Sequence, residues 1–255
     1  QAESSHIVLN AHKINAGELI TLNNKNKDFF FFEKQDVRSV MGALIYLVKT
    51  KLPEYIGTSP FEIQVLTPMR KGELGVEHLN EVLQYYLNPA SESKKEKEGR
   101  IGVFREGDKV MQVKNNYKLE WKITNAKGFS VEEGLGVFNG DMGVIKQINT
   151  YSERITVVFD ENREVEYPYS NLDELELAYA ITIHKSQGSE YPAVVLPLLS
   201  GPPILCNRNL LYTAITRAQK CAAIVGRQSM VEQMIHNETE QKRYSGLNEC
   251  LKDGI

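Results

Sequence analysis

The sequence predicts an α/β protein in which a parallel sheet flanked by helices is interrupted by a small β-barrel. Apolar strands alternate with amphipathic helices over residues 1–106 and again over residues 171–255, an order typical of a parallel sheet. Residues 107–170 differ, because short alternating segments are separated there by Gly-Asp, Asn-Gly-Asp and Asp-Glu-Asn turns. We therefore expect one α/β domain in two parts, 1–106 and 171–255, with a barrel inserted over 107–170.

The elements of the first α/β part follow from the spacing of its apolar residues. Gly17 is a stop signal for the first helix, and Asp36 is available as the N-cap of the second. The mixed-charge run at 91–100 is most simply a solvated loop. The pattern predicts, in chain order, a helix over 4–16, a strand over 29–32, a helix over 36–51, a strand over 61–66 and a helix over 76–86.

The barrel and the second α/β part are predicted in the same way. The expected barrel strands span 109–113, 143–148, 154–159 and 164–167. After Leu172 the parallel sheet is expected to resume, and two helical stretches are expected to close the chain. The predicted elements of this part are strands over 175–181, 193–198 and 221–225 and a helix over 209–217.

Composition excludes several classes of protein. The 255 residues include 30 Lys and Arg and 33 Asp and Glu, a formal net charge of −3, so any contact with nucleic acid must come from local patches. No apolar run approaches the length of about 20 residues that crosses a bilayer, so no membrane role is expected. Cys206, Cys221 and Cys250 are widely spaced, which argues against a disulfide scaffold or a cysteine zinc site and favours a reducing cytoplasm.

The common catalytic templates are absent from the sequence. The chain has no H-E-x-x-H, no G-x-S-x-G and no cluster of Cys and His, so no metal site is expected. It has no G-x-x-x-x-G-K-[ST] loop, so it cannot hold a nucleoside triphosphate by the P-loop route alone. Because the chain begins with Gln1 and a helical pattern starts within a few residues, we expect it to be part of a longer protein.

One polar run stands out as a candidate binding site. An apolar strand turns abruptly into hydroxyl, imidazole, ammonium, amide and carboxylate groups over Ala-Ile-Thr-Ile-His-Lys-Ser-Gln-Gly-Ser-Glu, which ends at Glu190. Thr182, His184, Ser186 and the backbone near Gly188 can donate hydrogen bonds to phosphate oxygens. The carboxylate of Glu190 can accept a hydrogen bond from a ribose hydroxyl. The alternative is a strand-to-helix turn whose polar residues act only as caps.

A second run ends in a single arginine. Arg208-Asn209-Leu-Leu-Tyr-Thr-Ala-Ile-Thr-Arg-Ala has an apolar helix face, and Arg217 lies at the end of the expected helix. A lone arginine near a helix C-terminus is most often a dipole partner or a member of a surface ion pair. A guanidinium on a rigid element is also what an arginine finger requires to stabilise a transition state.

Together the two runs resemble motifs V and VI of superfamily 1 helicases, specifically the RecD-like 5′→3′ DNA helicases, whose members include the exodeoxyribonuclease V alpha subunit. The matching letters are T-x-H-K-S-Q-G-S-E followed by N-L-L-Y-T-A-I-T-R-A. The run Val-Leu-Thr-Pro-Met-Arg that ends at Arg70, with Gly75 and Leu79-Asn80, resembles the family's segment after its second motor strand. Asn139-Gly140-Asp141 with Gly143 resembles the opening of the family's inserted SH3-like barrel. Gln1-Ala2 resembles the residues that follow the arginine of motif IV.

The resemblance implies that the α/β part is a RecA-like second motor domain, called 2A, and that the barrel is the SH3-like domain 2B. The first motor domain, 1A, with the P-loop, the Mg²⁺ ligands and the adenine contacts, would lie outside this chain. ATP binds between the two motor domains of such helicases. The residues implied are Arg217 and Gln187 for catalysis, Gly188, Ser189, Glu190 and Arg217 for nucleotide binding, and Thr67, Thr182, His184 and Ser186 for single-stranded DNA.

The barrel offers a third candidate. Tyr117 and Trp121 lie among lysines, a composition typical of a platform on which the bases of a single strand stack. The alternative is an exposed hairpin whose aromatic rings pack on the barrel. The module is acidic from Asp160 to Glu176, so its basic side would be confined to this loop. The lysines concerned are Lys114, Lys118, Lys122 and Lys127.

The resemblance to RecD-like helicases implies the C-terminal motor half of an ATP-dependent DNA helicase, which would translocate on single-stranded DNA and unwind duplexes in DNA repair or recombination. The chain alone is expected to be inactive as an ATPase. The expected partners are single-stranded DNA, domain 1A and subunits of the RecB or RecC type. The alternatives are a conjugative relaxase-helicase, an RNA helicase of the same superfamily, or a non-catalytic nucleic-acid-binding module that has kept the fold.

Overall fold

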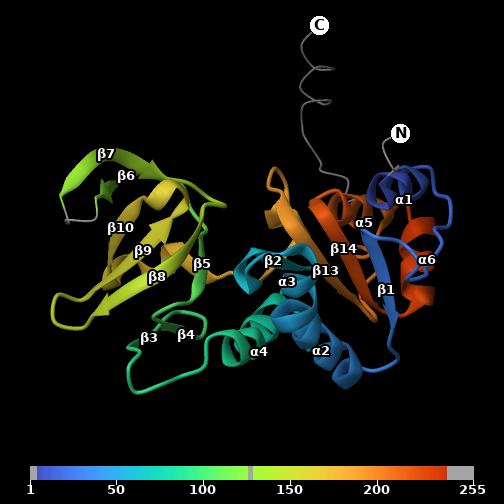
Figure 1. Cartoon of the computed structure of the whole chain (residues 1–255), viewed down its shortest axis with the longest axis horizontal. Helices are drawn as coiled ribbons and strands as arrows, with labels where there is room; N and C mark the ends of the chain where they lie inside the picture. Colours follow the sequence, from blue (N-terminus) through green and yellow to red (C-terminus); the bar gives the residue numbers. More distant parts are fainter. Residues whose placement is uncertain (1–4, 126–128, 240–255) are drawn as a thin grey trace, which may run out of the picture.

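A parallel sheet of five strands forms the centre of one lobe, on the right in Figure 1. The computed structural model describes residues 5–125 and 129–239. The strands lie in the order β1-β14-β13-β2-β12, and every neighbouring pair is parallel. Their bounds are β1 Phe29–Glu33, β2 Ile63–Thr67, β12 Ala180–Thr182, β13 Tyr191–Leu198 and β14 Ala218–Gly226.

Helices cover both faces of this sheet and bury two separate apolar clusters. Val195 in β13 packs on the side of α2 and α4, whereas its neighbours Val194 and Leu196 pack on the side of α1, α5 and α6. This alternation is what a strand buried on both faces requires. The helices are α1 His6–Asn15, α2 Val37–Tyr46, α3 Leu52–Ile56, α4 Val76–Leu87, α5 Arg208–Ile215 and α6 Gln228–His236, with a π-helical turn, Leu47–Lys51, between α2 and α3.

The local signals in the first part of the chain are confirmed. The carboxylate of Asp36 accepts a hydrogen bond from the backbone N–H of Ser39 at 2.9 Å and so caps α2. Gly17 follows the C-cap of α1 with a φ of +75°, in the left-handed region that ends helices. The aromatic run that begins at Phe29 is a strand whose alternate residues are buried. The second of the two closing helices falls in 240–255, outside the described residues.

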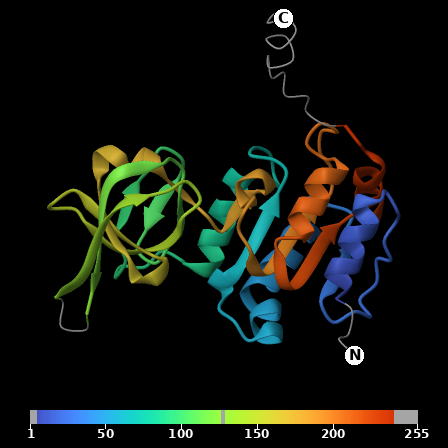
Figure 2. The same ribbon diagram turned by 90° about the horizontal axis from the view of Figure 1, so that it is seen from above.

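An antiparallel sheet of seven strands forms the second lobe and confirms the inserted β-barrel. Its strands lie in the order β11-β5-β8-β9-β10-β6-β7, and it wraps around a core that includes Ile145, Val157 and Val165. Figures 1 and 2 show this lobe beside the parallel sheet. The strands are β5 Lys109–Gln112, β6 Asn116–Thr124, β7 Ser130–Val137, β8 Met142–Asn149, β9 Arg154–Phe159, β10 Glu164–Pro168 and β11 Leu175–Leu177.

Two segments differ from the expected pattern. Residues 175–181 were expected to form one strand of the parallel sheet, but Leu175–Leu177 pairs with β5 in the antiparallel sheet and only Ala180–Thr182 joins the parallel one. The reason is the alternation Leu-Glu-Leu, in which both leucines are buried and the glutamate is not. The run at 91–100 is also more than a loop, because Glu96–Glu98 (β3) pairs with Val103–Arg105 (β4) in a short hairpin.

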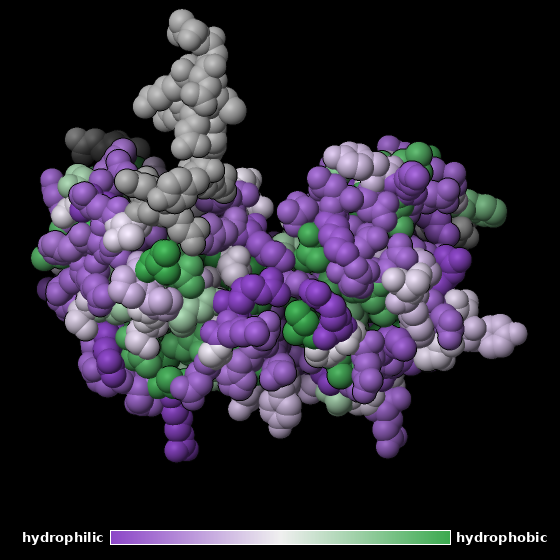
Figure 3. All heavy atoms as spheres, turned by 180° about the vertical axis from the view of Figure 1, so that it is seen from behind, coloured by the Kyte–Doolittle hydropathy of each residue, from purple (hydrophilic) through white to green (hydrophobic). Residues whose placement is uncertain are grey.

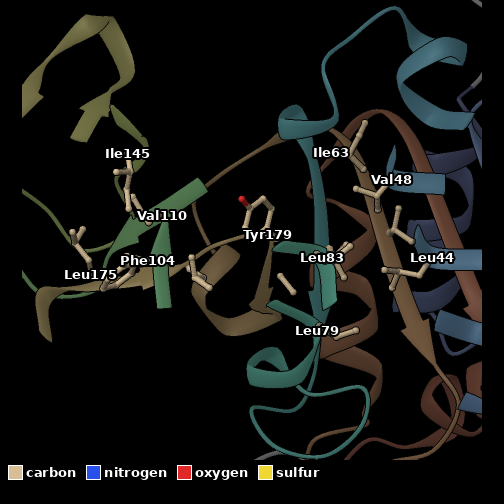
Figure 4. Packing of buried hydrophobic residues seen from close by; sticks show 14 of the residues in the cluster. Leu44, Val48, Ile63, Leu79, Leu83, Phe104, Val110, Ile145, Leu175 and Tyr179 are labelled. Atoms are coloured by element: carbon tan, nitrogen blue, oxygen red, sulfur yellow. The ribbon is translucent and has the colours of Figure 1, made fainter. Parts of the chain in front are cut away.

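The two lobes share one apolar cluster at their junction. Figure 4 shows Tyr179 between Val110 and Phe104 on the barrel side and Leu83 and Ile63 on the side of the parallel sheet. Seen from behind, the molecule is covered mostly by hydrophilic residues, with hydrophobic patches between them (Figure 3). The shared apolar cluster therefore holds the barrel against the α/β lobe, in addition to the two chain connections between them.

Buried polar groups reinforce this junction. The carboxylate of Asp108 accepts hydrogen bonds from Gln84 at 2.6 Å, from Asn88 at 2.7 Å and from the hydroxyl of Tyr179 at 2.8 Å. Burial raises the pKa of Asp108, although these hydrogen bonds act in the opposite direction. Three of the four residues come from the α/β side, so the network ties the start of the barrel to that lobe.

Candidate functional site

The polar run after β12 forms an exposed turn with its own cap. Residues Ile183–Ser186 make a 3-10 turn, and the hydroxyl of Thr182 accepts a hydrogen bond from the backbone N–H of Lys185 at 3.3 Å. His184 and Gly188 are exposed. Gly188 has a φ of +87° and open space where a Cβ would lie. Glycine is therefore favoured here by the backbone conformation and not by a lack of space for a side chain. The turn therefore has the side-chain cap of a structural turn and also exposes polar groups to solvent.

Thr67 and Ser186, which were expected to face DNA, lie inside the fold. Both residues are fully buried. The hydroxyl of Thr67 donates to the carbonyl of Leu74 at 2.7 Å, and the hydroxyl of Ser186 donates to the carbonyl of Ile183 at 2.6 Å. A buried hydroxyl that satisfies a nearby carbonyl avoids the cost of an unpaired polar group. These two hydroxyls hold loops in place and do not reach solvent, contrary to the expectation.

Arg217 lies between α5 and β14, two residues beyond the end of the helix that was expected to include it. Its guanidinium donates to the carbonyl of Ser189 at 3.1 Å, to the carbonyl of Thr213 at 3.3 Å and to the hydroxyl of Thr216 at 3.3 Å. The bond to Thr213 satisfies a carbonyl of the last turn of α5, as a dipole partner does. Within residues 5–125 and 129–239, no carboxylate forms an ion pair with Arg217. Its charge is therefore positioned but not neutralised.

The strand registers place the two ends of the polar run at opposite edges of the sheet. Thr182 is the last residue of β12 and lies opposite Thr67, the last residue of β2. Tyr191 and Ala218 lie opposite each other as the first residues of β13 and β14. Because the strands are parallel, Thr182 is at the carboxyl edge, and the residues just before Tyr191 and Ala218 are at the amino edge. We call residues 182–190 the crossing segment.

The amino-edge end of the crossing segment brings together most of the residues expected to bind nucleotide. The bond from Arg217 to Ser189 joins two of them directly. Gln187 is exposed, and its backbone N–H donates to the carbonyl of His184 at 3.3 Å. The exposed carboxylate of Glu190 accepts a hydrogen bond from the side-chain amide of Gln219 at 3.1 Å. The structure therefore presents an amide, a glycine backbone, a carboxylate and a guanidinium at one edge.

The two barrel aromatics have different surroundings. Trp121 is half-buried and lies over Gly134 on β7, so close that a Cβ on that glycine would be 2.3 Å from the indole ring. The guanidinium of Arg163 lies 5.9 Å from the centre of the Trp121 ring. Tyr117 is 67% exposed and contacts Phe138 edge-to-face, with 5.6 Å between ring centres. Trp121 thus has the contacts of a packed hairpin, whereas Tyr117 presents its ring to solvent.

The lysines near these aromatics are also not equivalent. Lys114 forms an ion pair with Asp173, so its charge is neutralised within the protein. Lys118 and Lys122 are exposed on β6. Lys127 lies outside the described residues. Of these two exposed lysines, Lys122 lies opposite Glu164 on β10, and its charge helps to lower the pKa of that carboxylate.

Two family models match separate parts of the chain. One, described as the SH3 domain of ATP-dependent RecD-like DNA helicases, matches residues 79–159. The other, described as the C-terminal domain of UvrD-like helicases, matches residues 177–225 and so includes the crossing segment and Arg217. Over these two ranges the chain is therefore similar to RecD-like and UvrD-like helicases. The inserted barrel of this RecD-like chain is accordingly an SH3-like domain, and the α/β lobe is of the helicase motor type.

Individual relatives show the same similarity. The RecD-like chain is 40% identical to the ATP-dependent RecD2 DNA helicase of Deinococcus radiodurans over 63% of its own length and 19% of that protein. It is 30% identical to the RecBCD enzyme subunit RecD of Mycolicibacterium smegmatis over 75% of its length and 29% of the relative. The chain thus spans less than a third of the length of these two curated relatives.

A solved structure shows the same fold. The crystal structure of a Pif1 helicase from Bacteroides, in complex with ADP-AlF3 and single-stranded DNA, aligns with 100% of the RecD-like chain and 55% of that protein. The TM-score is 0.51 and the sequence identity is 17%. At this identity the likeness concerns the arrangement of the two lobes and not the roles of residues.

The structure also reveals a charged group that sequence patterns did not single out. The carboxylate of Glu176 in β11 lies 3.2 Å from the guanidinium of Arg70, 3.0 Å from the ammonium of Lys185 and 4.0 Å from the guanidinium of Arg100. Burial alone would raise the pKa of Glu176, but Lys185 and Arg70 outweigh it and hold the pKa below its usual value. We call these four residues the Glu176 cluster.

Other chemistry is sparse in the described part of the RecD-like chain. There, no three side chains of His, Cys, Asp or Glu lie close enough together to hold a metal ion. Cys206 and Cys221 are buried thiols, and burial raises the pKa of Cys206 to about 11 and that of Cys221 to about 12. Cys250 lies outside the described residues. No helix in the two described ranges is both long enough and apolar enough to span a membrane.

Proposed function

We propose that this RecD-like chain is the C-terminal motor half of an ATP-dependent DNA helicase that moves along single-stranded DNA and unwinds duplexes. The observation that carries the proposal is the crossing segment. Its carboxyl-edge end exposes His184 next to Thr182, and its amino-edge end is hydrogen-bonded to Arg217. One short segment therefore joins groups suited to a DNA backbone with groups suited to a nucleotide. The names of the relatives, ATP-dependent DNA helicase and RecBCD subunit, support the same function.

The amino edge fits the polyphosphate of ATP. The guanidinium of Arg217 has fixed geometry and an unpaired charge among the described residues, which suits an anion. Gly188 leaves open space beside an exposed backbone, so a phosphate can approach the main chain. ATP, when bound, supplies the phosphoanhydride whose hydrolysis drives the motor. Gln187, Gly188 and Ser189 would then line one wall of the nucleotide site, with Glu190 placed to accept from a ribose hydroxyl.

The remaining parts of the ATPase site are proposed to come from domain 1A. The sequence has no P-loop, and the described residues offer no cluster of acidic groups for Mg²⁺. Arg217 would act on the charge that develops on the transferring phosphoryl group, because a guanidinium with preset geometry stabilises that charge without reorganising. ATP-driven closure of the two motor domains would pull on the amino-edge end of the crossing segment. Thr182 and His184 at the other end would hold phosphates of the DNA strand.

We further propose that the whole protein acts in DNA repair or recombination, either alone or with subunits of the RecB or RecC type. The relatives include both arrangements by name, a RecD2 helicase and a RecBCD subunit. Copurification of the full-length protein from its native cells, followed by identification of bound chains, separates the two arrangements.

The decisive experiment measures ATP hydrolysis and strand separation by the full-length polypeptide that contains this chain. Single-stranded DNA is expected to stimulate hydrolysis, and a duplex with a single-stranded tail is expected to be unwound only when ATP is present. Binding of single-stranded DNA without stimulated hydrolysis would identify a non-catalytic binding module instead. Equal stimulation by RNA and DNA would favour an RNA helicase of the same superfamily.

A further inference from the structure

The Glu176 cluster contains more positive charge than its single carboxylate neutralises. The side chain of Glu176 is 15% exposed, whereas those of Arg70 and Arg100 are 41% and 69% exposed. The side chain of Lys185 is 25% exposed, and its ammonium donates to the carboxylate at 3.0 Å. A guanidinium has five N–H donors and an ammonium has three, so one carboxylate cannot satisfy all of them. Solvent-facing donors therefore remain on three cations that Glu176 holds together.

The cluster joins parts of the chain that are distant in sequence. Arg70 follows β2, Arg100 is in the loop between β3 and β4, Glu176 is in the barrel strand β11, and Lys185 is in the crossing segment. It thus lies at the seam between the barrel and the carboxyl edge of the parallel sheet. This is the edge at which Thr182 caps the turn that carries His184 and Lys185.

We propose that the Glu176 cluster is a binding site for the phosphodiester groups of single-stranded DNA. The proposal rests on the proposed function, because it requires a strand that passes along Thr182 and His184. Carboxylate and phosphate oxygens accept from the same guanidinium and ammonium donors, so an arriving phosphate competes with Glu176 for Arg70 and Lys185. Glu176 is a positioning residue that keeps the cations in place and limits their affinity for the strand.

Nearby acidic groups set the expected size of the effect. Glu77 and Glu81, both in the first half of α4, line the same hollow as Arg70 and Glu176. These carboxylates lower the positive potential near the cations. We therefore expect the Glu176 cluster to make two or three separate contacts with phosphates and not to act as an extended basic groove. Each phosphate contact made by one of the cations is expected to contribute about 0.7 to the slope of log affinity against log salt on single strands.

The test compares charge variants of the full-length polypeptide in binding a fluorescein-labelled oligodeoxythymidylate. Glu176→Gln keeps an oxygen acceptor but removes the charge, and it should tighten binding about two- to fivefold at low salt, the range of one surface charge pair. This gain should vanish as salt is raised. Arg100→Ala removes a side chain with little role in folding, since it is 69% exposed. It should weaken binding by a similar factor and lower the salt slope by about 0.7.

Arg38→Ala is the matched control. Arg38 is exposed at the start of α2, the helix that follows β1 in the sequence, and β1 and β12 are the two opposite edge strands of the parallel sheet. This change should leave the affinity for the oligonucleotide unaltered. If the wild-type protein binds the oligonucleotide and Glu176→Gln binds it equally or more weakly, the cluster only braces the barrel and the proposal is wrong. A wild-type protein that binds no single-stranded DNA would overturn the proposed function, and this site with it.

Discussion

Arg217 illustrates how the fold can hold a charge without neutralising it. Its three hydrogen bonds go to two carbonyls and a hydroxyl, which fix the plane of the guanidinium. Carbonyls and hydroxyls orient a cation but leave its charge available to an incoming anion. The two interpretations that the sequence allowed, dipole partner and arginine finger, are therefore compatible in one side chain.

Arg217→Ala in the full-length protein should lower the DNA-stimulated hydrolysis rate by about 10³-fold or more, because an arginine finger acts mainly on charge in the transition state. The affinity for ATP should fall far less. Steady-state hydrolysis and binding of a fluorescent ATP analogue measure the two quantities separately. Arg217→Lys, which keeps the charge but not the planar fork, should recover only part of the rate. A rate within about threefold of wild type for Arg217→Ala would assign this residue to structure.

Lys109 is a second residue whose surroundings predict a measurable effect. It is buried at the junction, where its ammonium donates to the carbonyl of Phe61 at 2.7 Å and to the side chain of Gln64 at 2.9 Å. Burial lowers the pKa of Lys109 from 10.5 to about 7, and the charge of Glu62 opposes this only in part. Between those two values the unfolded chain binds more protons than the folded chain, so stability should rise with pH.

Lys109→Met removes this titration. The free energy of unfolding of the wild type, relative to that of the variant, should therefore increase as pH rises. The expected gain is at most about 1.4 kcal/mol per pH unit between about pH 7 and about pH 10. Urea unfolding at several pH values in this range measures it. The exposed Lys49 on the π-helical turn provides the control, since Lys49→Met should leave the pH dependence unaltered. Parallel curves for wild type and Lys109→Met would show that the amine stays charged in the fold.

At the scale of elements, local sequence signals predict helix ends and strands correctly, but they do not identify partners that are distant in the sequence. The cap at Asp36, the helix end at Gly17 and the strand that begins at Phe29 each depend on a few neighbouring residues. The motif that contains Thr67 identifies residue types but not which side chains face inward. The hydroxyl of Thr67 is buried because Thr67 is the last residue of β2, a strand that is covered on both faces.

The Glu176 cluster shows the same limit more clearly. Its members come from four separate parts of the chain, and no periodicity links positions so far apart. The same is true of β11, which was assigned to the wrong sheet because its pairing partner, β5, is more than sixty residues earlier in the sequence. A segment in which apolar and polar residues alternate over only three positions is compatible with either sheet, and only its pairing partner distinguishes the two.

The crossing segment is the element on which the proposed coupling depends, and Gly188 allows it to be tested. Gly188→Ala creates no clash, but a residue with a side chain at a φ of +87° is strained by about 1–2 kcal/mol. The turn should therefore change shape, lowering both DNA affinity and hydrolysis. Gly57 has a φ of +68° and the same open surroundings at the end of α3. Gly57→Ala should lower stability alone, and equal effects of the two variants on activity would contradict the coupling.

In the β6–β7 hairpin, we expect Trp121 to contribute to packing and Tyr117 to contribute to DNA binding. Trp121→Ala should destabilise the protein by about 2 kcal/mol or more, because the indole covers Gly134 and packs on the core, but it should not alter DNA affinity. Tyr117→Ala should have the opposite profile, with a loss of about 1–3 kcal/mol of binding if its ring stacks on a base. Thermal unfolding and oligonucleotide titration measure the two effects. A weaker affinity for Trp121→Ala at unchanged stability would restore this residue to the DNA contacts.

For the whole molecule, the shared core determines how the two lobes behave. One apolar cluster runs from Leu44 and Leu83 through Tyr179 to Ile145 and Val157 without a break between lobes. The buried carboxylate of Asp108 adds hydrogen bonds across the same junction. Domains that share a core and a satisfied polar network are expected to unfold together, since separating them exposes apolar surface and unpaired polar groups at once.

We therefore expect the chain to unfold in urea as one cooperative unit. Trp121 is the sole tryptophan and reports on the barrel, whereas far-ultraviolet circular dichroism reports mainly on the helices of the α/β lobe. The two transitions should coincide in the wild type. Asp108→Ala leaves the donors of Gln84, Asn88 and Tyr179 without their acceptor, each at a cost of about 1–3 kcal/mol, so the two transitions should separate. Asp160→Ala, at an exposed position in the barrel, should keep them together. Separate transitions in the wild-type chain would mean that the barrel folds independently. The barrel could then change its position relative to the α/β lobe during the motor cycle.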